Sequence, residues 1–195
     1  MKLLFSLIIA TTTPAWCQLK PAQAQAELSR KIVIEESKDA DAALTKSAGP
    51  DPVTETTYDL TKNIVVRKKA SGTVEKLPFL NLPVLFQKDT TALVDAKSAD
   101  NVKALAEALK SISSQEPGAR FQIEGHASRD GTEDHNQQLS QQRADAVRRS
   151  LVADYNVNPT AIRSTGFGEK FAQAPETALE VELEKDRVVR VVKLK

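Results

Sequence analysis

The C-terminal part of the chain carries regular alternations of apolar and polar positions. Apolar residues stand at every second position over residues 80–86, with a proline at 83, which predicts a strand buried on at least one face and lying near an edge or a strand start. A second alternation over residues 121–125 predicts another strand, and shorter segments at 161–165 and 187–193 predict two more.

Two segments between these strands repeat their apolar residues at three- and four-residue steps, which is typical of amphipathic helices. The first is expected to start at Ser98 as N-cap and to end before Pro117-Gly118, and the second to run from Thr132 as N-cap to about Asp154. The order strand, helix, strand, helix, strand, strand predicts an α/β two-layer sandwich over residues 77–195, with a mixed sheet and the helices on one face.

The segment before this domain is polar and interrupted by Gly and Pro. Residues 27–76 are therefore predicted to form a flexible tether. Within it, residues 63–67 are predicted as a short strand, and the basic triplet Arg67-Lys68-Lys69 is interpreted as a solvated charge run.

The N-terminus has the pattern of a secretory signal peptide. A lysine precedes an apolar run over residues 3–10, and we expect residues 1–26 to hold the signal, with cleavage between positions 17 and 26. The run is far shorter than the roughly 20 residues needed to cross a bilayer, so no transmembrane span is expected. The alternative is a lipoprotein acylated at Cys17, which the bulky Trp16 disfavours.

Charge and cysteine content narrow the possible partners. The formal net charge is +1, from 27 basic and 26 acidic residues, so no global field directs the chain to nucleic acid. One cysteine excludes a disulfide framework and a Cys-based zinc site. We expect no metal, no cofactor and no nucleic-acid partner.

One arginine interrupts an apolar helix face. Leu139, Arg143, Val147 and Leu151 fall on one i, i+4 row, and a guanidinium there needs an acceptor. The alternative is that its stem packs beside the core while its head reaches water. Residues 125–131 before this helix form a strand end, a Gly-bearing turn and a helix N-terminus, which favour an anionic ligand such as a carboxylate. The two glycines of this segment are otherwise explained by turn geometry.

Four segments carry a resemblance to a known family. They are Ile123-Glu124-Gly125-His126, Asn136-Gln137-Gln138-Leu139-Ser140-Gln141-Gln142-Arg143-Ala144, Gly166-Phe167-Gly168-Glu169 and Asp186-Arg187-Val188-Val189. In order and spacing they resemble the OmpA C-terminal domain, a peptidoglycan-binding module also found in peptidoglycan-associated lipoproteins and flagellar stator proteins. The resemblance covers about residues 77–195. It implies a non-catalytic domain in the periplasm, at the outer membrane, that binds the peptide stem of peptidoglycan noncovalently, with other envelope proteins as further partners.

The resemblance also implies which residues hold the ligand. The arginine matching Arg143 binds a carboxylate of diaminopimelate, which would supply the missing acceptor through a bidentate contact. The other residues assigned to the ligand site are Phe86, Ala127, Ser128, Asp130, Gly131, Asn136, Leu139 and Arg187.

Two departures from the family pattern bear on this site. Ser128 stands where the family has an acid that pairs with the ligand's amino group, so we expect weaker binding unless Asp130 takes its place. In the closing motif, Asp186 replaces an asparagine and Val188 a second arginine. These departures keep open an alternative function, an envelope scaffold that has lost the cell-wall pocket.

An enzymatic site is the third possibility. It would use His126, His135 and Glu124 around a metal, or His126 with Ser128 as base and nucleophile. The nine-residue spacing of the histidines matches no zinc signature, and Glu124 alternates with a buried position, so it is expected to face solvent or the opposite side of the sheet. We therefore expect no catalytic residues and interpret His126 as a structural turn residue.

Overall fold

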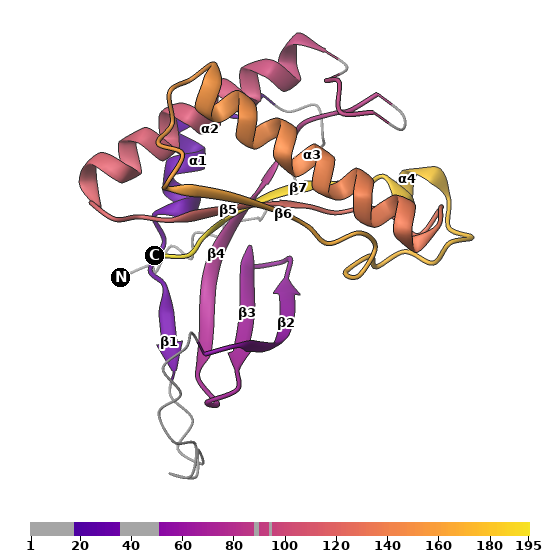
Figure 1. The fold of residues 1–195 in the computed structure, drawn as a ribbon, viewed down its shortest axis with the longest axis horizontal. Helices are drawn as coiled ribbons and strands as arrows, with labels where there is room; N and C mark the ends of the chain where they lie inside the picture. Colours follow the sequence, from indigo (N-terminus) through magenta and orange to yellow (C-terminus); the bar gives the residue numbers. More distant parts are fainter. Residues whose placement is uncertain (1–17, 36–50, 88–89, 94) are drawn as a thin grey trace, which may run out of the picture.

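The central strands are covered by helices on one face and by a hairpin on the other (Figure 1). The structure, a computed structural model, describes residues 18–35, 51–87, 90–93 and 95–195. Its helices are α1 (Pro21–Leu28), α2 (Ala96–Gln115), α3 (Glu133–Ala153) and α4 (Glu180–Leu183). Its strands are β1 (Val33–Glu35), β2 (Val53–Asp59), β3 (Ile64–Lys69), β4 (Val74–Leu82), β5 (Phe121–Gly125), β6 (Ile162–Gly166) and β7 (Val189–Lys193).

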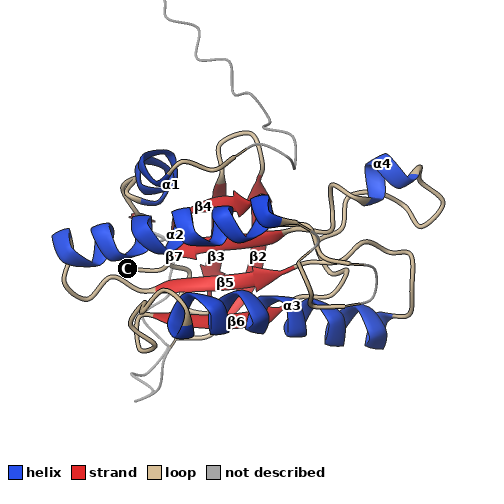
Figure 2. Ribbon diagram, turned by 90° about the horizontal axis from the view of Figure 1, so that it is seen from above, coloured by secondary structure: helices blue, strands red, loops and turns tan. Residues whose placement is uncertain are grey.

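The sheet is mixed and has the order β2-β3-β4-β7-β5-β6, with β1 paired beside β4. Strands β5 and β6 are parallel, and the other pairs are antiparallel. From β4 onward the order of elements is as predicted, with α4 inserted before β7, but β4 covers residues 74–82 and not 80–86 and lies inside the sheet, between β3 and β7. Helices α2 and α3 lie over β7, β5 and β6, and α1 lies beside α2 on the side of β4 (Figure 2). The predicted α/β fold class is confirmed.

The predicted helices are present, and one cap differs. Thr132 caps α3, as predicted, by accepting a hydrogen bond from the amide of His135 at 3.3 Å. The N-cap of α2 is Asp95 and not Ser98, whose amide donates to the Asp95 carboxylate at 2.8 Å. The hydroxyl of Ser98 is turned inward and accepts from the amide of Leu85 at 3.0 Å.

The alternation along β5 divides its side chains between two buried layers. Phe121 and Ile123 join the core beneath the helices, which includes Leu105, Leu109 and Leu151. Gln122 and Glu124 face the other way and are also buried. Every residue of β5 is buried because the second face of the sheet is covered as well.

The chain before residue 77 differs from the predicted tether. Helix α1 packs on α2 and buries Ala24 and Leu28 completely, and β2 and β3 form a hairpin that continues into β4. The prediction of a flexible segment is therefore wrong for residues 27–35 and 51–76, while residues 36–50 lie outside the described ranges. A polar composition is compatible with these strands because their backbone groups hydrogen-bond to one another and their charged side chains form ion pairs with oppositely charged residues elsewhere in the chain.

The hairpin is joined to the sheet by charged and polar contacts. Arg67 of β3 donates to one carboxylate oxygen of Glu124 at 2.9 Å, and the Tyr58 hydroxyl of β2 donates to the other at 2.7 Å. The guanidinium of Arg190 on β7 lies 4.6 Å from the ring centroid of Tyr58 and 5.5 Å from that of Phe79. Glu124 thus lies on the opposite side of the sheet, as expected, but the hairpin seals it from solvent.

The three residues of the basic triplet Arg67-Lys68-Lys69 differ in their exposure to solvent. Arg67 is buried against Glu124, which contradicts its interpretation as a solvated charge. Lys68 is exposed and pairs with Glu55 at 2.7 Å, whereas Lys69 is half-buried and pairs with Glu75 at 2.5 Å.

The predicted signal peptide falls mostly outside the described part of the chain, which begins at residue 18. A cleavage after residues 21–25 would remove part of α1, and one after residue 24 or later would remove the buried Ala24. Within the described residues, no helix combines the length and the apolar character needed to cross a membrane.

Limited proteolysis distinguishes the hairpin from a tether. Because β3 is paired on both sides and Arg67 is buried, trypsin should cleave the folded chain after Arg67 and Lys68 as slowly as after Arg190 in β7. The same sites should be cut rapidly in urea. Early cleavage within residues 51–76, leaving a resistant fragment 77–195, would contradict this arrangement.

Candidate ligand-binding site

Helix α3 lies directly on the ends of β5 and β6, and two glycines allow the close approach. A Cβ atom on Gly125 would collide with the backbone of Ser140, and one on Gly166 would collide with the backbone of Gln141. Turn geometry is therefore not the reason for Gly125, which is needed for packing. The close packing of α3 on Gly125 and Gly166 holds the helix against the ends of the two strands, next to the loop that joins β5 to α3.

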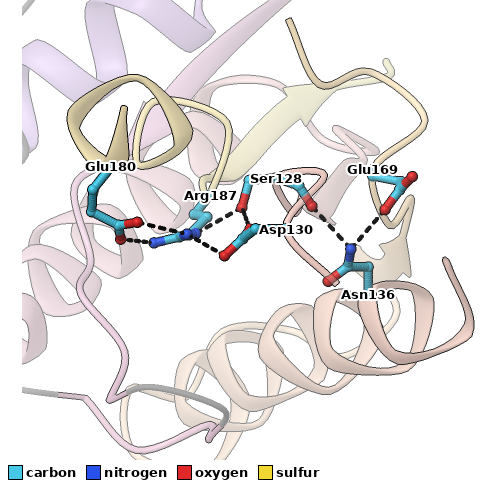
Figure 3. A network of polar contacts seen from close by, with 6 residues as sticks. All are labelled: Ser128, Asp130, Asn136, Glu169, Glu180 and Arg187. Carbon is cyan, nitrogen blue, oxygen red and sulfur yellow. Dashed lines mark hydrogen bonds and ion pairs between the residues drawn. The ribbon is translucent and has the colours of Figure 1, made fainter. Parts of the chain in front are cut away.

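A polar cluster forms where this loop meets the chain before β7 (Figure 3). The Arg187 guanidinium donates from Nε to the Ser128 hydroxyl at 2.7 Å and from Nη2 to the Asp130 carboxylate at 2.6 Å. It also holds the carboxylate of Glu180 on α4, and the Ser128 hydroxyl donates to Asp130. We refer to Ser128, Asp130, Glu180 and Arg187 as the Arg187 cluster.

Asn136 fixes the loop to the first turn of α3. Its side-chain amide donates to the backbone carbonyl of Ser128 at 3.0 Å and to the carboxylate of Glu169 at 2.7 Å (Figure 3). Gly131 lies against the same side chain, since a Cβ there would come 3.1 Å from the Asn136 amide oxygen. Ala127 is buried, and its amide donates to the carbonyl of Gly168 at 2.8 Å. These residues therefore position the loop.

The charges of the Arg187 cluster stabilise one another. The hydrogen bond to Glu180 is the main reason that the pKa of the Arg187 guanidinium is raised. Burial opposes ionisation of Asp130, but the hydrogen bond from Ser128 and the charge of Arg187 lower the pKa of its carboxyl below the ordinary value. Asp130 is therefore an anion at neutral pH, and 41% of its side chain is exposed.

Arg143 lies farther along the same face of α3. Its Nε donates to the carbonyl of Thr90 at 3.2 Å, its Nη2 is 3.5 Å from the carbonyl of Gln87, and its guanidinium lies 5.1 Å from the ring centroid of Phe86. Seven residues separate it from Asn136, which places the two about 10 Å apart along the helix axis. Leu139 lies between them and is buried. The predicted residues thus follow one helix face in two groups, with Phe86 and Arg143 at one end and the Arg187 cluster at the other.

Two acidic residues of the site were not predicted. Glu169 belongs to a segment that carries the family resemblance, but its sequence gives no sign of the contact with Asn136. Glu180 is the first residue of α4 and Arg187 follows that helix, so the helical spacing within α4 does not predict their contact. Asp186, the departure in the closing motif, is buried and accepts hydrogen bonds from the amides of Gln173 and Ala174 at 3.0 and 2.9 Å, so it holds the loop before β7.

A cleft of about 660 Å³ lies beside Glu169, and none of the four residues of the Arg187 cluster is among its lining residues. It lies between the first turns of α3 and the loop after β6, and both charge signs are represented among its lining side chains, which include Arg129, Glu133, Glu169 and Lys170. This volume is within the range of pockets that hold small molecules.

The structure does not place His126 and Ser128 together as a base and a nucleophile. The Ser128 hydroxyl contacts Arg187 and Asp130, whereas His126 packs against the rings of Tyr58, Phe167 and Phe171. Among the residues that the structure describes, no group of three or more His, Cys, Asp or Glu side chains is placed to hold a metal ion.

The comparison with known proteins decides the family. Residues 85–184 match the OmpA family, and these 100 residues are just over half of the 195 in the chain. The chain belongs to the OmpA family. The matched region begins after β4 and ends before β7, so β1 to β3 and Arg187 lie outside it.

Its relatives are larger proteins. The chain is 33% identical over 111 residues to outer membrane porin F of Pseudomonas aeruginosa, covering 57% of this chain and 30% of the porin. It is 30% identical over 118 residues to outer membrane protein Omp38 of Acinetobacter baumannii, covering 60% of this chain and 28% of that protein. The chain therefore spans less than a third of the length of these relatives.

A solved structure with a TM-score above 0.5 shares the fold, and a second structure is a further match. The C-terminal domain of Helicobacter pylori MotB is 16% identical, with a TM-score of 0.51 and coverage of 60% of this chain and 84% of that domain. The peptidoglycan-associated lipoprotein of Burkholderia pseudomallei is 25% identical, with a TM-score of 0.49 and coverage of 56% of this chain and 87% of that protein.

His126 lies behind the site in an aromatic environment. Its ring stacks on Phe167 at 5.6 Å and meets Tyr58 edge-on at 5.5 Å, and neither nitrogen has a hydrogen-bond partner within the described ranges. The nearest carboxylate oxygen, of Glu124, is 3.6 Å from Nε2. Burial lowers the pKa of His126 below its ordinary value of 6.5 and outweighs the opposite effect of Glu124.

This burial predicts a dependence of stability on pH. Below about pH 6.5 the unfolded chain takes up a proton on His126 that the folded chain excludes, so the free energy of unfolding should fall as the pH falls, by at most about 1.4 kcal/mol per pH unit. Urea unfolding between about pH 5 and pH 7 measures this slope. A His126→Phe variant should lose that part of the slope, and a variant with an unchanged slope would contradict the assignment.

Proposed function

We propose that this protein binds peptidoglycan noncovalently through its stem peptide, and that diaminopimelate is the residue recognised. The observation that carries the proposal is a pair of oppositely charged groups within the OmpA-family region, Arg143 on α3 and Asp130 in the loop before that helix. The side chain of diaminopimelate ends in a carboxylate and an ammonium group. A guanidinium fork suits the first and a carboxylate suits the second.

Asp130 is proposed to replace the acid that position 128 lacks. Its carboxylate contacts the Ser128 hydroxyl and is partly exposed, so a ligand ammonium group could approach it without any movement of the backbone. Ser128 then orients Asp130, and Arg187 holds the carboxylate in its anionic form.

The proposed role is structural and non-catalytic. The chain would link the cell wall to other components of the envelope, in the periplasm at the outer membrane, after export by its N-terminal signal. Its similarity to proteins named as outer-membrane proteins and the apolar run at residues 3–10 support this location. The alternative function, an envelope scaffold without cell-wall binding, is the outcome to expect if the site proves inactive.

Removal of the Arg143 guanidinium tests the carboxylate contact. Arg143→Ala should weaken binding of a diaminopimelate muropeptide by about 2–3 kcal/mol, roughly 30- to 150-fold, because a charge-assisted bidentate contact is lost. Arg149→Ala, an exposed arginine on the same helix, is the matched control and should bind as the wild type does. Isothermal titration measures both, with circular dichroism to show that each variant is folded.

The ligand provides a second control. A muropeptide with lysine in place of diaminopimelate lacks the second carboxylate, so it should bind the wild type weakly and show little difference between the wild type and Arg143→Ala. Equal sacculus binding by the wild type and a folded Arg143→Ala variant would contradict the proposed contact and favour the scaffold function.

A second prediction concerns the position of the acid. Asp130→Asn should weaken muropeptide binding by about 1 kcal/mol, roughly fivefold, because the ligand ammonium loses a partly exposed anionic partner. The double variant Ser128→Asp/Asp130→Ser, which moves the acid to the family position at constant charge, should restore most of that loss in the same titration. If Asp130→Asn binds as tightly as the wild type, Asp130 does not contact the ligand.

A further inference from the structure

The guanidinium of Arg187 holds a carboxylate of its own chain. Both oxygens of Glu180 face it: Oε1 contacts Nη1, and Oε2 lies 3.3 Å from Nη2 (Figure 3). This is the two-point contact that an arginine fork makes with any carboxylate. The structure thus shows a carboxylate seated on Arg187, at the end of the candidate site opposite Arg143.

The orientation of Arg187 is determined separately from Glu180. Its Nε donates to the Ser128 hydroxyl and its Nη2 to Asp130, and both partners belong to the loop after β5. These bonds hold the guanidinium in place whichever carboxylate lies on the Nη1 side. Arg187 is therefore a preorganised anion-binding group.

Glu180, by contrast, is weakly held. Its side chain is 65% exposed and belongs to the four-residue helix α4, in which Leu183 is the buried residue. Leu179 and Val181, on either side of Glu180, are 71% and 60% exposed. Asp186 holds the base of this loop through the amides of Gln173 and Ala174 and makes no contact with Glu180 in these bonds. Ion pairs with such an exposed partner contribute little to stability.

We propose that Arg187 is a second carboxylate-binding group of the ligand site and that Glu180 occupies it as an intramolecular competitor. The ligand would be a peptide with a carboxylate in addition to the one that Arg143 binds, and in this respect the inference rests on the proposed function. Binding of that carboxylate displaces Glu180, and the affinity is lower than Arg187 would otherwise give.

The carboxylate site can be tested without peptidoglycan. Glutarate, a dicarboxylate without an ammonium group, is titrated into the ¹⁵N-labelled full chain, and the Nε–Hε resonance of Arg187 is followed by NMR. The variants are Glu180→Gln, which keeps the side-chain shape, and Glu184→Gln, an exposed residue beside α4 that gives the same change in net charge. Arg187→Lys removes the fork.

Glutarate should shift the Arg187 resonance and the amides of α4 in the wild type. Glu180→Gln should lower the concentration at half-saturation two- to fivefold, as expected when an exposed competing ion pair is lost, whereas Glu184→Gln should leave it unchanged. In Arg187→Lys, the glutarate-induced shifts of the α4 amides should disappear. Equal responses of Glu180→Gln and Glu184→Gln, or no shift at Arg187 in any of the proteins that retain it, would overturn the proposal.

Titration of the same variants with the diaminopimelate muropeptide separates this inference from the proposed function. If the glutarate result holds but the muropeptide does not bind, Arg187 is a carboxylate site and peptidoglycan is not its ligand. If the muropeptide binds in an Arg143-dependent manner and Glu180→Gln has no effect with either probe, the function stands and the competitor is disproved.

Discussion

A carboxylate buried within a sheet must be neutralised and hydrogen-bonded, and Glu124 imposes this requirement on the whole molecule. Its two oxygens take bonds from Arg67 and Tyr58, which lie on the two strands of the β2–β3 hairpin. The hairpin in turn covers the face of β5 that the helices leave open. Removing either partner would leave a buried charge without full compensation, so the hairpin and the sheet are energetically one unit.

The same buried layer supports the ligand site. One residue after the buried Glu124, Gly125 lets α3 approach the sheet, and His126 fills the aromatic pocket beneath the loop. The amide of His126 bonds to the carbonyl of Val188 at 2.9 Å, so the loop after β5 is joined to the segment that carries Arg187. Packing at the end of β5 thus determines where Ser128 and Asp130 meet that arginine.

The site itself combines three segments, of which the third is distant in the sequence from the other two. The loop after β5 supplies Asp130, α3 supplies Asn136 and Arg143, and the end of the α4 loop supplies Arg187. Ser128 carries no charge, but its hydroxyl joins Asp130 to Arg187. Asp130, two residues along the loop, forms an ion pair with Arg187, and Glu180 adds a second carboxylate to the same guanidinium.

The sequence by itself determined the elements whose signal is local. The alternation over residues 121–125, the helical spacing after Thr132 and the order of elements after residue 77 specified the fold class and the helix face that carries Arg143. Only the tertiary structure decided that residues 51–76 form a hairpin, that Arg67 is buried and that Glu180 lies on Arg187. Periodicity predicts which side chains face a core, but not which charged side chains contact one another. Arg67 and Tyr58 bond to Glu124, from which they are separated by 57 and 66 positions in the sequence. Polar contacts at such separations depend on how the chain folds back, so no short-range pattern contains them.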